Sequence, residues 1–78
     1  MNPILVKAVW DGEAGVWVAT SDNVPGLATE AATISELEAR LEVVIPELLR
    51  ENGIHTWEGA EVPLELLASK NLDLTKAC

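Results

Sequence analysis

The side chains that could carry chemistry in this sequence are mostly carboxylates. A nuclease that uses two Mg²⁺ ions needs several carboxylates that converge from neighbouring strands. The acids here fall instead in turn sequences, on the polar side of a predicted helix and near Val62. Glu30 is the exception, because it lies inside a predicted strand. This distribution is typical of a solvated surface, and only Glu30 keeps a residual metal-dependent nuclease open as an alternative.

The other reactive side chains do not form a catalytic group. No Ser, Cys or Thr can be placed beside His55 together with an orienting carboxylate, so a nucleophilic triad has no support. Cys78 is the single thiol and offers neither an internal disulfide nor metal-ligand spacing. The glycines on either side of Asp11 do not cradle a phosphate, because no helix begins there. We therefore expect no enzyme, no cofactor and no bound metal.

Composition limits the kind of partner. The chain has 78 residues, with 5 basic against 13 acidic residues and a net charge of -8, and it has no Phe or Tyr. Such a chain repels phosphate backbones, cannot stack exposed bases on Phe or Tyr rings, and favours basic proteins as partners. A single domain of this size is marginally stable alone, so we expect a homo-oligomer, most simply a dimer. No signal peptide or membrane-length apolar run is present, which predicts a cytoplasmic protein.

One long helix is predicted between Thr33 and Gly53. Thr33 and Glu36 have the T-x-x-E spacing of a capping box. Asn52 and Gly53 supply a C-cap and a left-handed position, and Ile54 stands where a Schellman motif places an apolar contact. The apolar positions fall within roughly 140° of the helical wheel, as in a helix with one buried face. They are Ile34, Leu37, Leu41, Val44, Ile45, Leu48 and Leu49.

Pro46 interrupts this apolar stripe. A proline inside a helix removes the hydrogen bond to the carbonyl four residues earlier, here that of Glu42, and crowds it. We therefore expect either a kink or two shorter helices that share one apolar face.

A hairpin is predicted before the helix. The stretches 4–10 and 16–20 are rich in strand formers and flank a loop of about five residues with two glycines. If Trp10 pairs with Val16, one sheet face carries Ile4, Val6, Ala8, Trp10, Val16 and Val18 and takes the helix. The other face then carries Leu5, Val9, Trp17 and Ala19 and is more apolar than water-facing surfaces need to be. We expect copies of the chain to associate through that second face or through a sheet edge.

Two further strands complete the predicted order. Pro25 and Gly26 suit the centre of a type II turn, and residues 27–31 follow as a short third strand. Residues 62–68 contain Pro63, which is tolerated at a sheet edge, so we predict an edge strand there, with a helical turn as the alternative. The predicted class is α+β, an antiparallel sheet with one main helix packed on one face, in the order β-β-β-α-β. Residues 1–69 form the single domain and residues 70–78 a loose tail.

The connection after the helix is predicted to be a loop. Residues 54–60 follow the helix as this connection, and Trp57 is placed as a lid on the edge of the core.

Three stretches of the sequence are similar to a known family. They are residues 10–19 (WDGEAGVWVA), residues 22–27 (DNVPGL), and Thr33 at the head of an acidic amphipathic helix. Together they resemble the HicB-like antitoxin superfamily, and within it a small prokaryotic family of stand-alone domains. The resemblance implies a partial ribonuclease-H-like fold without nuclease activity. In the antitoxins this domain occludes a small basic RNA-cleaving toxin, while a separate C-terminal segment binds operator DNA. These 78 residues show no counterpart of that segment, and we expect no direct nucleic-acid binding.

The function predicted on this basis is binding and neutralisation of a small basic RNA-cleaving toxin. The acids expected to meet it lie on the exterior of the helix, at Glu36, Glu42, Glu47 and Glu51. Two alternatives stay open: a self-associating regulatory or structural module with no toxin partner, and the residual metal-dependent nuclease.

Overall fold

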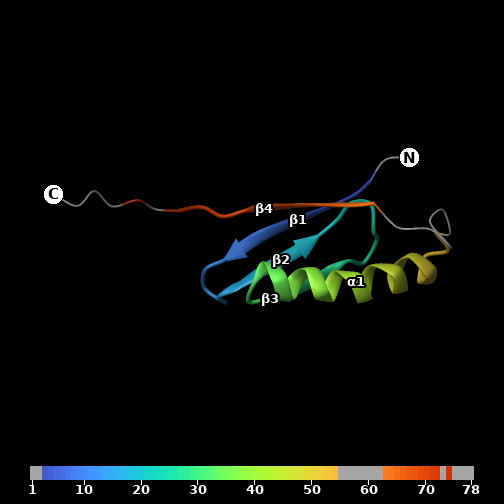
Figure 1. Cartoon of the computed structure of the whole chain (residues 1–78), viewed down its shortest axis with the longest axis horizontal. Helices are drawn as coiled ribbons and strands as arrows, with labels where there is room; N and C mark the ends of the chain where they lie inside the picture. Colours follow the sequence, from blue (N-terminus) through green and yellow to red (C-terminus); the bar gives the residue numbers. More distant parts are fainter. Residues whose placement is uncertain (1–2, 55–62, 73, 75–78) are drawn as a thin grey trace.

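The residues that the structure describes contain five secondary-structure elements, which follow one another in the predicted order. The computed structural model describes residues 3–54, 63–72 and 74. The elements are β1 (Ile4–Asp11), β2 (Val16–Thr20), β3 (Ala28–Ala31), α1 (Ile34–Glu51) and β4 (Leu64–Ser69). The four strands form one sheet in the order β3-β2-β1-β4, and α1 packs on one of its faces (Figure 1). The α+β class and the β-β-β-α-β order are therefore confirmed.

The sheet is mixed, which corrects the prediction of an antiparallel sheet. β1 pairs antiparallel with β2, and β2 with β3, but β4 pairs parallel with β1. The helix is the reason: α1 carries the chain back along the sheet after β3, so β4 starts from the same end as β3 and β1. Pro63 lies immediately before β4, and its carbonyl accepts a hydrogen bond from the Ile4 N–H at 2.8 Å. The predicted edge strand is confirmed, and the alternative of a helical turn is wrong.

The register of the hairpin differs from the predicted one by one residue. Asp11 belongs to β1 and pairs with Val16, so Trp10 pairs with Trp17. The two indoles meet edge to face, with ring centroids 5.4 Å apart. Since side chains alternate between the faces of a strand, this one-residue shift moves every side chain of β2 to the opposite face.

Hydrogen bonds of Asp11 account for the shorter loop. Its carboxylate accepts from the backbone N–H groups of Glu13 at 3.1 Å and Ala14 at 3.2 Å. Its carbonyl accepts from the N–H of Gly15 at 2.8 Å, and Gly15 has the left-handed φ of 69° that closes the turn. The loop therefore contains four residues, 12–15, rather than five.

The predicted composition of the two faces changes accordingly. Trp17 and Ala19 lie on the face that packs against α1, and Ala19 is fully buried. The expected interface of Leu5, Val9, Trp17 and Ala19 is therefore not one surface. Leu5 and Val9 do lie on the open face, where they are joined by Val16 and Val18. Alternation of apolar residues could not choose between the two registers, because both give each face a row of apolar side chains.

The segment between β2 and β3 is hydrogen-bonded to the start of β1. Gly26 has a φ of 84° and the Leu27 N–H donates to the Val24 carbonyl at 3.1 Å, which confirms the type II turn. The Ser21 hydroxyl donates to the Leu5 carbonyl at 2.6 Å, and the Asn23 side-chain oxygen accepts from the Leu5 N–H at 2.8 Å. These two bonds take the place of strand partners beyond the end of β2.

Both predicted ends of the helix are confirmed. The Thr33 hydroxyl accepts from the Glu36 N–H at 3.1 Å. At the other end the Ile54 N–H donates to the Leu49 carbonyl at 2.8 Å and Gly53 has a φ of 69°, as in a Schellman motif. The Asn52 side chain also donates to the Leu48 and Pro25 carbonyls, at 2.8 Å and 3.2 Å. This bond to Pro25 fixes the end of α1 to the turn before β3.

Pro46 lies inside one continuous helix of 18 residues. The alternative of two shorter helices is therefore wrong.

The core lies between α1 and the β3-β2-β1 part of the sheet. Its side chains are all apolar, and no buried polar side chain occurs among residues 3–54, 63–72 and 74. The helix lies alongside β3 and β2, with β4 on the far side of β1 (Figure 1). The buried residues are Ile4, Val6, Ala8, Ala19, Val24, Leu27, Ala31, Leu37, Leu41, Ile45 and Leu49.

Some predictions fall on other parts of the chain. The loop with Trp57, and His55, Val62 and Cys78, lie outside the described residues. At the start of the predicted tail, the Lys70 ammonium lies 4.4 Å from the centre of the Trp10 ring, so this residue contacts the domain. No helix in the described part of the chain is long and apolar enough to cross a membrane.

Candidate protein-binding groove between α1 and β4

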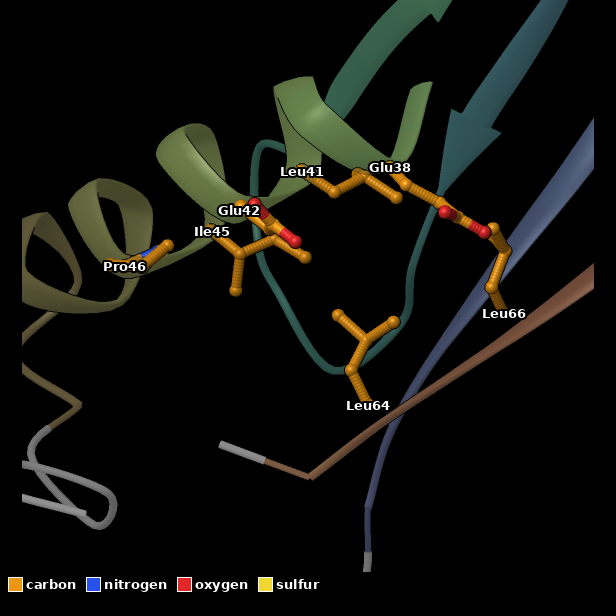
Figure 2. A pocket seen from close by; sticks show the side chains of 7 residues that line it. All are labelled: Glu38, Leu41, Glu42, Ile45, Pro46, Leu64 and Leu66. Atoms are coloured by element: carbon orange, nitrogen blue, oxygen red, sulfur yellow. The ribbon is translucent and has the colours of Figure 1, made fainter. Parts of the chain in front are cut away.

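An open groove separates α1 from β4. It has a volume of about 530 Å³ and exists because α1 lies over β2 and β3 and leaves the β4 side of the same face uncovered. Figure 2 shows side chains of the helix and of β4 facing each other across it. The groove is lined by Glu38, Leu41, Glu42, Ile45, Pro46, Leu64 and Leu66.

The floor of the groove is apolar. Leu64 and Leu66 pair with Ile4 and Val6 in the parallel register, so they share the helix-facing side of the sheet with these two core residues. Ile4 and Val6 are fully buried, whereas Leu64 remains 39% exposed. The core cluster encloses Ile4 and Val6 completely, whereas on β4 only Leu66 packs against it, and Leu66 is only partly buried.

The wall formed by α1 combines apolar and acidic groups. Leu41 and Ile45 close the inner side, and Glu38 and Glu42 stand at the rim one helical turn apart. Pro46 continues the same flank and has no N–H to donate to the Glu42 carbonyl. The wall therefore offers two carboxylates, and a backbone carbonyl without its usual helical partner, beside an apolar surface.

The structure divides the four acids that were predicted to bind a partner. Glu42 lies at the groove. Glu36, Glu47 and Glu51 are exposed, but at 100° per residue they lie roughly 120–180° around α1 from Glu42. The sequence reasoning missed Glu38, although its spacing of four from Glu42 and its place beside the apolar stripe signal the same flank.

The open face of the sheet is a second apolar surface. Val9 is 56% exposed and Leu67 on β4 is 47% exposed. Lys7 lies on the same face, where it pairs with Leu67 and precedes Val9 by two residues. Glu30 lies on this face opposite Val18, at the β3 edge, where Arg40 of α1 lines the same small hollow. Among the residues that the structure describes, no three acidic, histidine or cysteine side chains lie together as a metal would require.

The described residues define a small α+β domain with one helix and with an acid-rimmed apolar groove beside an uncovered edge strand. The chain belongs to the family described as "Domain of unknown function (DUF1902)", which matches residues 3–75. Its structure is similar to that of hypothetical protein TTHA1013 from the extremely thermophilic bacterium Thermus thermophilus. The two share 55% sequence identity and a TM-score of 0.70 over 96% of this chain and 100% of the other. No curated protein matches the sequence.

Proposed function

We propose that this domain is a non-catalytic protein that binds and neutralises a small basic RNA-cleaving toxin in the cytoplasm. The observation that carries the proposal is the groove between α1 and β4, which places the carboxylates of Glu38 and Glu42 beside exposed leucines. The HicB-like resemblance of residues 10–19 and 22–27 supports it, and the partial ribonuclease-H-like assignment of the fold is part of the same proposal.

The chemistry of the groove selects a particular kind of ligand. An apolar floor binds aliphatic or aromatic side chains, and carboxylates at its rim bind Lys or Arg on the same segment. The Glu42 carbonyl adds an acceptor for a donor on that segment. A net charge of -8 attracts a basic protein before contact is made, because complementary charge raises association rates.

Rescue of cell growth tests the proposal. The domain is co-expressed with the small basic protein encoded beside its gene, and growth is compared with that of cells expressing the basic protein alone. We expect the domain to restore growth. A neighbouring basic protein whose toxicity the domain leaves unchanged, or the lack of such a neighbour, would overturn the proposal.

Two double charge reversals locate the site. Glu38→Lys with Glu42→Lys changes the groove, whereas Glu47→Lys with Glu51→Lys makes the same change of net charge on the other side of α1. We expect the groove variant to lose rescue and its matched control to keep it. Loss of rescue in the Glu47/Glu51 variant alone would place the site on the helix exterior instead. Circular dichroism melting of both variants tests whether they remain folded.

The salt dependence of toxin binding separates long-range electrostatic attraction from direct contact in the groove. Raising the ionic strength from 0.01 to 0.15 M shortens the Debye length from about 30 to about 8 Å, so the toxin should associate more slowly. Both double variants should lose part of this salt dependence, because both remove long-range charge. Only the groove variant should also dissociate faster, which surface plasmon resonance measures directly.

The absence of catalysis is part of the proposal. We expect no cleavage of RNA or of RNA–DNA hybrids with Mg²⁺ or Mn²⁺. Metal-dependent cleavage by the purified protein that disappears in a Glu30→Ala variant would establish the nuclease alternative instead.

A further inference from the structure

The outer edge of β4 has hydrogen-bonding groups without partners among residues 3–54, 63–72 and 74. The Ile4 N–H donates to the Pro63 carbonyl, and in a parallel ladder this fixes which residues of β4 face β1. Positions 65, 67 and 69 direct their backbone groups toward β1. The N–H and C=O groups of Leu64, Leu66 and Ala68 therefore point away from the sheet.

This edge also lacks the usual protection against pairing. Natural edge strands are shortened, bulged, interrupted by proline or covered. β4 is six residues long, its proline precedes it, and each of its residues except Leu66 is exposed. Its single charged residue is Glu65. A strand with so little burial gains little to offset the entropy of its own ordering, so a second neighbour would stabilise it.

We propose that β4 pairs antiparallel with β4 of a second copy of this chain, across a two-fold axis normal to the sheet and centred on Leu67. A two-fold axis of this kind places one residue opposite itself. Centring on Glu65 would oppose two like charges, and centring on Leu66 would leave them two positions apart. Centring on Leu67 places Glu65 opposite Ser69 and moves the two carboxylates further apart.

The same register gives the outward-pointing backbone groups of β4 hydrogen-bonding partners in the second copy. Leu66 lies opposite Ala68, so outward-facing residues of both copies form hydrogen-bonded pairs. Lys70 of the second copy lies opposite Leu64, on the face that carries Glu38 and Glu42. The ammonium of Lys70 itself lies 4.4 Å from the centre of the Trp10 ring of its own chain.

Pairing also completes the groove. The two sheets become one sheet of eight strands, with both helices on the same face. At about 4.8 Å between neighbouring strands, helices over β2 and β3 are roughly 29 Å apart, which leaves a trough wide enough for a helix of about 10 Å. The β4 side of each groove, open in one copy, then faces the α1 of the other. The binding site of the single chain is therefore half of the site in the dimer.

Light scattering on the protein alone tests the pairing without any toxin. We expect a mass of twice 8.4 kDa at tens of micromolar. Leu67→Glu places like charges opposite each other and should give a monomer. Val9→Glu introduces the same charge on the open face, away from the outer edge, and should leave the dimer intact. If both variants are monomers, the open face is the interface and the proposed pairing is wrong.

A proline variant tests the backbone of the edge. Ala68→Pro removes an N–H that points outward and spares the bonds of β4 to β1, so it should give a folded monomer. A wild-type monomer, or a dimer that persists in both Ala68→Pro and Leu67→Glu, would overturn the proposal.

Cross-linking tests the register. In a Cys78→Ser background, Leu67→Cys should form an intermolecular disulfide on mild oxidation, because opposed residues of a non-hydrogen-bonded pair have Cα atoms about 4.5 Å apart. Ser69→Cys faces Glu65 rather than itself and serves as the control. Efficient cross-linking of the control but not of Leu67→Cys would contradict the register.

Discussion

The two edge strands of the sheet, β3 and β4, differ in their contact with α1. β3 is four residues long, and α1 lies against it. β4 is six residues long and makes no close backbone contact with α1. Its outer backbone groups have no partner among the residues that the structure describes. A single amphipathic helix cannot cover a four-stranded sheet, because its apolar stripe is narrower than the sheet. The β3 edge contributes Ala31 to the core, and the β4 edge is where we propose that a second copy pairs.

The largest difference between the two sides should appear on deleting an aliphatic side chain. Ile45 of α1 is 2% exposed on the side of the helix that packs on the sheet, so Ile45→Ala should cost about 2–5 kcal/mol of unfolding free energy. Leu64 is 39% exposed on the groove floor, and Leu64→Ala should cost about 1 kcal/mol or less in the monomer.

Both substitutions are made in Leu67→Glu, which is expected to be monomeric, and urea unfolding measures the two losses of stability. If Ile45→Ala is too unstable to study, Ile45→Val should cost about 0.5–1.5 kcal/mol. Equal costs for Ile45→Ala and Leu64→Ala would show that the helix stabilises both edges alike.

The turn before β3, which Asn52 ties to the end of α1, should show the next largest effect. Gly26 has a φ of 84°, so Gly26→Ala should cost about 1–2 kcal/mol through backbone strain. A Cβ there would meet the Leu48 side chain only at an ordinary 3.8 Å. Gly12→Ala is the matched control, since Gly12 has no such φ and its Cβ would come no closer than 3.7 Å to an atom of Trp10. Equal melting temperatures of the two variants would contradict the explanation by backbone strain at Gly26.

The smallest effect is expected where the chain leaves β4. The ammonium of Lys70 lies over the Trp10 ring, and such a contact contributes about 0.5–1 kcal/mol at an exposed site. Lys70→Ala should lower stability by that amount, whereas Lys70→Arg should preserve it and Lys7→Ala, on the open face, should have little effect. If Lys70→Arg and Lys70→Ala are equally destabilised, the ring contact does not hold the end of the strand.

Local signals predicted most of the fold. The ends of α1, the type II turn and the existence of each strand follow from residues that act within a few positions of themselves, such as Thr33, Gly26 and Gly53. The hairpin register did not, because it depends on which bonds Asp11 makes in the loop. The direction of β4 could be deduced only from the return path of the helix.

The candidate site was less predictable than the fold. Glu42 was identified, but Glu38 was missed and Glu36, Glu47 and Glu51 were grouped with it. The sequence alone does not show which acids on the polar side of a helix lie next to a particular strand. Which flank adjoins an uncovered strand depends on the lateral position of α1 over the sheet, and packing in three dimensions sets that position.

Amide hydrogen exchange within β4 tests most directly that this edge binds a partner copy. In wild-type protein at tens of micromolar, the amides of Leu66 and Ala68 should be protected, and in Leu67→Glu they should exchange much faster. The amides of Glu65 and Ser69, which face β1, serve as the internal control and should change far less. Equally fast exchange of Leu66 and Ala68 in both proteins would contradict the account, because the outer edge of β4 would then be unpaired in solution.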